Sequence, residues 1–454
     1  MESEIAKRIA ESLQAKLTGR EEQALAIKPT RNPEAYDAYL RGLAFEARAQ
    51  SSAGPVPSWE AAGFYERAVQ LDPNFAVAWA RLSREDAHIY LNRFDTTEAA
   101  RGDAAKRALE NAQKLEPNSP ETLLALGYYQ YFVLLDYGTA KTTFDRVRKM
   151  LPSSSEVLRA LGGVVRRDGH WDESVAYFEQ ALALDPRNVE LLIQAASTYV
   201  MLRQFPAALK LYDRALDVVP NDPNTMASKA GIYQAQGNLK EAAKFLSEIN
   251  WQTDDSLSDI EIRIAQLKLE RNYGEAVRLL QARLAQSRSA SQGGAVEKAI
   301  EQVLLASMQR LAGDTAGAKI TAEQARITVD EFSRDQPDNG PRAVLLSQAY
   351  AVMGEKDSAL QEAQRAIMLY PRAKDQVSGP QLEENLASIQ TMFGENSRAI
   401  STLTQLLQTP YLKAHIICFT PPIVVTPALL RLDPIWDPLR ADPAFQKLCE
   451  EKQP

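Results

Sequence analysis

The sequence has little of what chemical sites and secreted scaffolds require. Its 454 residues include three histidines and two cysteines, Cys418 and Cys449. Two cysteines are too few for a disulfide framework and are typical of a reducing cytoplasm. No apolar run approaches the roughly 18 residues of a membrane span, because three prolines interrupt the most apolar stretch, residues 416–430. The N-terminus, MESEIAKRIAESLQ, lacks the apolar core of a secretory signal. We therefore expect a soluble, cytoplasmic protein.

An excess of positive charge is also missing. The chain has 52 basic and 59 acidic residues, a formal net charge of −7, which gives no electrostatic footprint for nucleic acid or an anionic membrane. The phosphate-binding patterns G-x-x-x-x-G-K-[ST] and G-x-G-x-x-G, the metalloprotease pattern H-E-x-x-H and the kinase signatures are absent. We therefore predict no catalytic residue, no metal and no cofactor in this chain.

What the sequence does contain is a period. Prolines close apolar helices at Pro73, Pro117, Pro152, Pro186 and Pro220, with gaps of 44, 35, 34 and 34 residues. Twelve residues before each proline stands a small residue, and eight before stands a large apolar or aromatic one. Four residues separate these two positions, so they share one helical face and predict a buried stripe on the second helix of each unit. A proline after that helix prevents its continuation.

This pattern resembles the tetratricopeptide repeat, a helix–turn–helix unit of 34 residues. The resemblance implies an all-α fold: a right-handed superhelix, or α–α solenoid, of about ten helix pairs. The small residue of the second helix marks each pair, at positions 61, 105, 140, 174, 208, 242, 276, 318, 359 and 399. Gly169 and Gly237 are expected in the turns inside two of the pairs.

The spacing suggests four regions. Residues 1–30 are predicted as a helical lead-in, 31–285 as the regular array, and 286–409 as longer, degenerate pairs. Residues 410–454 break the period, and their Asp-Pro steps with Trp436, Leu439 and Phe445 predict short helices that cap the last pair.

Both ends carry a second resemblance. The stretch TPALLRLDPIWDPLRADPAFQKLC and the opening IAKRIAESLQAKLTGREEQALAIKPTRNPEAYDAYLRG are similar to segments at the ends of tetratricopeptide regions in bacterial signalling proteins. Those proteins are serine/threonine kinases, class III adenylate cyclases and winged-helix regulators. The resemblance implies a regulatory or sensory region, and it does not choose among the three effector domains, one of which could lie upstream.

In a tetratricopeptide array the first helices line a concave groove. Tyrosine and arginine, which often anchor interfaces, recur on the face of the first helices that lines this groove and beside that face. The predicted groove residues are Arg81, Arg84, Tyr128, Tyr131, Arg159, Arg166, Gln194 and Gln234.

The predicted function is a scaffold that binds a protein or peptide in this groove, without nucleic acid, membrane or catalysis. The groove positions that hold Lys and Asn in carboxylate-clamp repeats hold residues such as Arg159, Ile193 and Ser197 here, so a chaperone-tail receptor is not expected. Two alternatives stay open: a self-association module that forms a homo-oligomer, and a solenoid that senses a small molecule.

Overall fold

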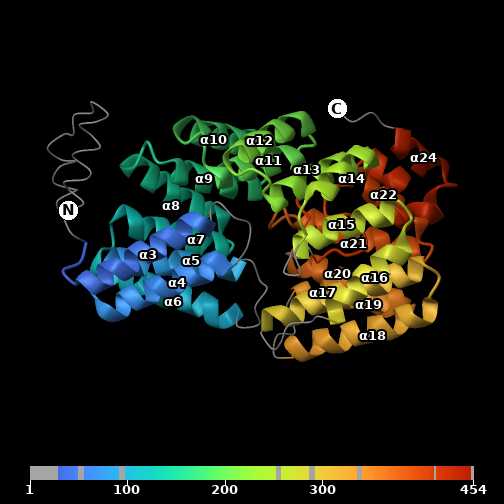
Figure 1. The fold of residues 1–454 in the computed structure, drawn as a ribbon, viewed down its shortest axis with the longest axis horizontal. Helices are drawn as coiled ribbons and strands as arrows, with labels where there is room; N and C mark the ends of the chain where they lie inside the picture. Colours follow the sequence, from blue (N-terminus) through green and yellow to red (C-terminus); the bar gives the residue numbers. More distant parts are fainter. Residues whose placement is uncertain are drawn as a thin grey trace. The chain divides into compact units, whose positions relative to one another are not determined.

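The computed structural model describes residues 29–49, 56–91, 98–251, 257–285, 292–334, 340–413 and 416–450 (Figure 1). Residues 1–28 of the predicted lead-in lie outside these ranges. Every regular element within them is a helix, which confirms the predicted all-α class.

The helices from α3 to α22 follow one another in chain order as ten pairs along the described part of the chain. The first five pairs are α3 (Pro33–Ala49) with α4 (Val56–Leu71), α5 (Ala76–Leu91) with α6 (Glu98–Leu115), α7 (Pro120–Phe132) with α8 (Tyr137–Met150), α9 (Ser155–Arg167) with α10 (Trp171–Leu184), and α11 (Val189–Met201) with α12 (Phe205–Val218). The next five are α13 (Pro223–Ala235) with α14 (Leu239–Glu248), α15 (Leu257–Leu269) with α16 (Tyr273–Ala285), α17 (Gln292–Leu311) with α18 (Thr315–Phe332), α19 (Gly340–Met353) with α20 (Lys356–Leu369), and α21 (Gly379–Met392) with α22 (Asn396–Leu407).

The chain divides into two compact units. Unit 1 contains α3 to α7 and ends at Leu134, and unit 2 runs from Leu135 through α8 to the C-terminus.

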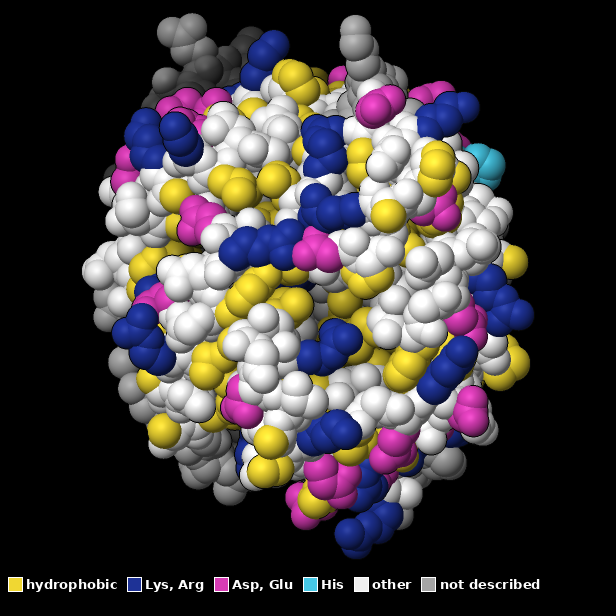
Figure 2. Space-filling model, turned by 90° about the vertical axis from the view of Figure 1, so that its right-hand side faces the viewer, with side chains coloured by type: hydrophobic (Ala, Val, Ile, Leu, Met, Phe, Trp, Pro, Cys, Tyr) yellow, Lys and Arg dark blue, Asp and Glu magenta, His cyan; other side chains and the backbone are white. Residues whose placement is uncertain are grey.

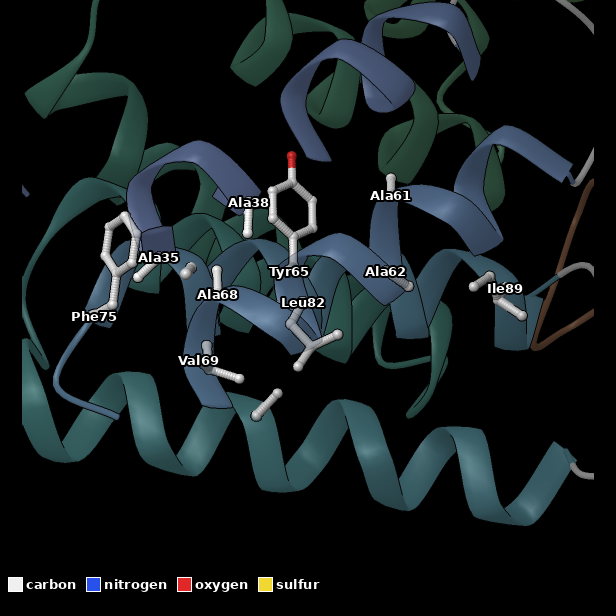
Figure 3. Packing of buried hydrophobic residues seen from close by; sticks show 12 residues of the cluster. Ala35, Ala38, Ala61, Ala62, Tyr65, Ala68, Val69, Phe75, Leu82 and Ile89 are labelled. Atoms are coloured by element: carbon white, nitrogen blue, oxygen red, sulfur yellow. The ribbon is translucent and has the colours of Figure 1, made fainter. Parts of the chain in front are cut away.

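The core of unit 1 follows the predicted stripe of small and aromatic residues (Figure 3). Ala61, Tyr65 and Ala68 of α4 are all fully buried against α3. A Cβ atom on Gly42 of α3 would lie 2.5 Å from Cε1 of Tyr65, so the aromatic ring fits because this position has no side chain. Close approach of the two helices thus depends on a small residue on one helix and an aromatic one on the other.

Unit 2 repeats the same packing rule. Ser174 of α10 is fully buried and donates a hydrogen bond of 2.8 Å to the carbonyl of Gly162 in α9. Phe178, one turn further along α10, lies where a Cβ on Gly162 would come within 3.0 Å of its ring. The predicted turn glycines Gly169 and Gly237 have φ of 82° and 77°, the left-handed region that glycine adopts without strain.

Side-chain caps start the first helices of unit 2. Ser154, Asn188 and Asp222 accept hydrogen bonds from the backbone N–H three residues later, at the starts of α9, α11 and α13. These bonds satisfy N–H groups that have no partner inside the helix. The polar residue that follows each helix-closing proline therefore begins the next repeat.

After α22 the chain leaves the repeat pattern. It forms α23 (Pro427–Leu432), the 3₁₀ helix η1 (Pro434–Leu439) and α24 (Pro443–Glu450). Helix η1 packs on α21 and α22, and α24 packs on α22. Residues 410–450 are called the C-terminal segment below. Residues 416–425 of this segment contact Arg203, α15 and α19, which lie 68 to 222 residues earlier in the chain.

Candidate protein-binding faces

The first helices of unit 2 hold the C-terminal segment. Gln348 of α19 donates to the carbonyl of Ile416 over 2.7 Å and accepts from the N–H of Cys418 over 2.8 Å. Lys268 of α15 donates to the carbonyl of Phe419 over 2.6 Å. Both side chains bind main-chain groups, so they fix the path of this irregular, turn-containing stretch.

A second set of contacts holds the following residues. Arg203, two residues after the end of α11, donates to the carbonyl of Val425 over 3.2 Å, and its other nitrogens donate to the carbonyls of Leu406 and Thr409. Thr426 donates over 2.6 Å to the carbonyl of Ala235, the last residue of α13. The contacts with the C-terminal segment therefore come from first helices between α11 and α21, or from a residue just after such a helix.

Two buried ion pairs accompany these main-chain contacts. Lys268 lies 2.7 Å from Asp433, with side-chain exposures of 4% and 0%. Lys413 lies 2.7 Å from Glu384 of α21, with 1% and 1%. Burial lowers the pKa of Lys413, and the nearby Glu384 carboxylate opposes that shift. Buried charges are costly unless paired and hydrogen-bonded, and Lys413 also donates to the carbonyl of Pro421 over 2.7 Å.

Apolar burial continues along the segment. Phe419, Val424, Leu430 and Trp436 are each 2% exposed or less. A small cavity of about 10 Å³ remains between α15, α17 and residues 417–422, which is room for about one water molecule. This cavity is too small for a metabolite.

A loop also connects early and late repeats of unit 2. Asp375, between α20 and α21, accepts from Tyr137 of α8 over 3.0 Å and from Arg167 of α9 over 2.8 Å. Burial would raise the pKa of Asp375, but Arg167 and the backbone N–H groups of Ser378 and Val377 hold it below its ordinary value. We call the side of each unit that is formed by the first helices of its pairs the first-helix side. In unit 2 this side therefore binds later residues of the same chain, both through Asp375 and through the C-terminal segment.

The corresponding side of unit 1 carries a cluster of charged residues instead. Glu46 of α3 accepts from Arg81 of α5 over 2.6 Å and from the hydroxyl of Tyr65 over 2.5 Å. Arg84 lies 3.6 Å from the same carboxylate, and its guanidinium stands 5.2 Å from the ring centre of Tyr128. Burial opposes ionisation of Glu46, but Arg84 and Arg81 lower its pKa. We call Glu46, Arg81, Arg84 and Glu85 the unit 1 ion cluster.

Two carboxyl groups of α5 are buried here, Glu85 of the cluster and the adjacent Asp86. Burial, followed by the charge of Glu46, raises the pKa of Glu85 to about 8. Burial raises the pKa of Asp86 to about 6, although Arg101 lies 2.8 Å away and opposes the shift. At neutral pH a neutral Glu85 leaves Glu46 with two arginines, so the cluster carries net positive charge.

The structure places the eight predicted groove residues in three groups. In unit 1, Arg81 and Arg84 join the ion cluster, and the rings of Tyr128 and Tyr131 pack at a tilt against Phe132, with centroid distances of 5.3 and 4.5 Å. In unit 2, Arg166 donates to Thr198 over 2.9 Å and to the Gln194 side chain over 3.2 Å, while Arg159 pairs with Glu190 over 2.6 Å. Gln234 donates to the Gln266 side chain over 3.1 Å. None of the eight is fully exposed.

The side chains that hold the C-terminal segment did not appear among the sequence-based candidates. Arg203, Lys268, Gln348 and Glu384 are 8% exposed or less. The sequence did contain an indication of these residues: charged and amide side chains stand on helices whose other buried positions are small or apolar. One repeat alone could not reveal their partner, because it lies up to 222 residues away.

Among the described residues, no helix is long and apolar enough to cross a bilayer, and no group of three or more His, Cys, Asp or Glu side chains is arranged to hold a metal ion.

Comparison with known proteins agrees with the repeat architecture. Two models of the tetratricopeptide repeat match residues 130–189 and 165–224. Tetratricopeptide repeats therefore occupy residues 130–224 of the chain, and the described residues form an all-α solenoid of helix pairs.

Curated relatives are similar over part of their length. Anaphase-promoting complex subunit 6 of Arabidopsis thaliana is 28% identical over 185 residues, 40% of this chain and 32% of that protein. The DnaJ homolog subfamily C member 7 homolog of Schizosaccharomyces pombe is 24% identical over 209 residues, 43% of each. The chain thus spans less than half the length of these relatives.

Solved structures share the helical architecture at low identity. A tetratricopeptide repeat protein from Parabacteroides merdae has a TM-score of 0.41 and 18% identity, covering 59% of this chain and 97% of that one. The human IFIT1 dimer with m7Gppp-AAAA has a TM-score of 0.44 and 15% identity, covering 81% and 76%. The expectation that this chain binds no nucleic acid stays a prediction.

Proposed function

We propose that the chain is a protein-binding scaffold without catalysis of its own, and that its partner docks on the first-helix side of unit 1. Tetratricopeptide repeats and relatives such as the anaphase-promoting complex subunit support the general role. The observation that carries the choice of side is the difference in occupancy. In unit 2 the first helices hold the chain's own C-terminal segment, whereas in unit 1 they present the ion cluster.

The chemistry of this cluster favours an acidic partner segment. Arg81 keeps 21% of its side chain exposed beside Glu46, and Arg84 lies behind it. Arginine forms planar, paired hydrogen bonds with carboxylates, and such bonds gain strength where water is largely excluded. A carboxylate of the partner would therefore bind the exposed edge of Arg81.

A matched pair of variants tests this assignment. The partner is isolated with the full chain as bait, purified, and its affinity measured by calorimetry for Arg81→Met and Arg159→Met. Arg159 of unit 2 is a suitable control, because it is also 21% exposed and also pairs with a glutamate over 2.6 Å. We expect about a tenfold loss or more for Arg81→Met and little change for Arg159→Met. Equal affinities for both variants and the wild type would exclude unit 1 as the docking site.

We further propose that the scaffold is the regulatory or sensory region of a cytoplasmic bacterial signalling protein. The resemblance of both ends of the chain to such regions supports this role. Reading the native locus upstream of the codon for Met1 tests it. A continuous frame into a kinase, cyclase or winged-helix domain is expected, and an unrelated upstream gene with a separate start would count against it.

Self-association is a second candidate that one observation favours. Ile320 and Ile327 are 63% and 44% exposed and stand two turns apart on one face of α18. Figure 2 shows that hydrophobic side chains also reach the surface between lysines and arginines on one side of the molecule. Light scattering over a range of concentrations, with Ile320→Ser and Ile327→Ser as the comparison, decides whether this face forms a dimer.

A further inference from the structure

The C-terminal segment is held in unit 2 as a peptide ligand would be held. Gln348 binds both the carbonyl of Ile416 and the N–H of Cys418, and Lys268 and Arg203 bind the carbonyls of Phe419 and Val425. Main-chain hydrogen bonds of this kind give affinity that depends little on the peptide's sequence, whereas side-chain pockets give specificity. The main-chain contacts therefore account for binding but not for selection.

Selection comes from two features of the segment. Its apolar residues are interrupted by prolines, which prevent a continuous helix over residues 416–426, and Phe419 and Val424 are 1% and 2% exposed. An acidic residue follows, Asp433, which meets Lys268 at 2.7 Å with both side chains buried. The surface thus fits an apolar, proline-containing peptide with one carboxylate placed for Lys268.

We propose that the first-helix side of unit 2 is a peptide-binding surface that the chain occupies in cis, and that a free peptide of this chemistry binds it once the tethered segment is weakened. This site is separate from the unit 1 ion cluster. The two proposals therefore fail independently. The tether explains why the site is closed in the intact chain: a linked ligand acts at an effective concentration of about millimolar, far above that of a free competitor.

The experiment weakens the tethered segment and leaves the surface unchanged. Asp433→Asn in the full chain retains a side-chain oxygen for the N–H of Ile435 but removes the charge that pairs with Lys268. A fluorescent peptide with the wild-type sequence of residues 410–450 is then titrated by anisotropy. We expect no binding to the wild-type chain and saturable binding to the variant, because the free peptide brings the carboxylate that the tethered segment lacks.

Two controls define the site. Asp437→Asn affects an ion pair with Arg271 that is 40% and 44% exposed, so this variant should exclude the peptide as the wild type does. Asp433→Asn combined with Lys268→Met should bind the peptide at least tenfold more weakly than Asp433→Asn alone, since the carboxylate of the peptide then has no cation to meet.

These measurements decide whether the C-terminal segment behaves as a bound peptide or as an inseparable part of the hydrophobic core. A folded Asp433→Asn chain that excludes the peptide overturns the proposal, as does equal binding to the wild type. If Asp433→Asn loses its helical circular dichroism, the milder Ile423→Ala is tested in the same way; Ile423 is buried and lies close to Gly231 of α13. Unfolding of that variant as well would show that the segment is an inseparable part of the core, and would also overturn the proposal.

Discussion

Unit 1 and unit 2 are built from the same helix pair, yet their first helices face different surroundings. In unit 2 the main chain and apolar side chains of the C-terminal segment lie against them, with two buried ion pairs. In unit 1 they carry an ion cluster in which Arg81 keeps part of its side chain exposed. The comparison teaches that the repeat determines the scaffold, whereas a few inward polar residues determine what the scaffold holds.

The largest effect is expected from breaking the deepest ion pair of unit 2. Lys413→Met leaves the Glu384 carboxylate buried without its cation, which should cost about 3–5 kcal/mol of unfolding free energy. Arg271→Met, at the exposed pair with Asp437, should cost only about 0–1 kcal/mol. Urea denaturation of both variants measures the difference. Similar losses would show that the segment is held no more tightly at its buried end than at the surface.

The second prediction concerns pH and unit 1. The pKa of Glu85 is raised from its ordinary value of 4.5 to about 8, so the native state holds an extra proton between these pH values. The contribution of Glu85 to stability is therefore greatest below pH 4.5 and falls as the pH rises toward 8, by at most about 1.4 kcal/mol per pH unit.

Glu85→Gln should remove this dependence, because its amide stays neutral. The variant is expected to be more stable than the wild type at pH 9 and to differ little from it at pH 4.5. Denaturation at the two pH values, with the exposed Glu110→Gln of α6 as control, measures the change. A parallel pH profile for wild type and Glu85→Gln would contradict the assignment of the charge to this residue.

The third prediction tests what the two units share. Ala105 of unit 1 and Ala208 of unit 2 occupy the same small position of the second helix, and both are fully buried. Replacing either by leucine overpacks a helix pair, at a cost of about 1–3 kcal/mol. Comparable shifts in thermal unfolding are expected for the two variants. A neutral result at one site would mean that the repeat packing differs between the units.

The smallest effect is expected at a helix cap. Asp222→Ala removes the acceptor for the N–H of Thr225 at the start of α13, which costs about 0.5–2 kcal/mol. Asp222→Asn keeps an acceptor and serves as the matched control. Equal stability of the alanine variant and wild type would show that the cap contributes nothing to this repeat.

The periodic part of the fold could be predicted because its causes are local. The small residues at positions 61, 105, 140, 174 and 208 and the helix-closing prolines act within one repeat, and the structure forms ten pairs along its described residues as expected. Gly169 and Gly237 likewise adopt the left-handed turn conformation that their positions indicated.

The contacts made by the first helices could not be predicted from the repeat pattern in the same way. Lys268 and Asp433 are 165 residues apart in the chain, and nothing in one repeat specifies that the two meet. The aromatic and arginine residues proposed for the groove were chosen by their place on a helix. Tyr128 and Tyr131 turned out to pack with Phe132, which depends on the neighbouring side chains.

The most direct test of the central claim is hydrogen exchange of the C-terminal segment in the intact protein, measured by mass spectrometry. The claim is that residues 416–433 are bound by the first helices of unit 2. We expect the amide of Cys418, bonded to Gln348, and that of Val425, bonded to the Tyr411 hydroxyl, to exchange as slowly as amides within α13 and α19. Exchange of these amides within seconds, beside protected helices, would mean that the segment does not occupy this side of unit 2 in solution.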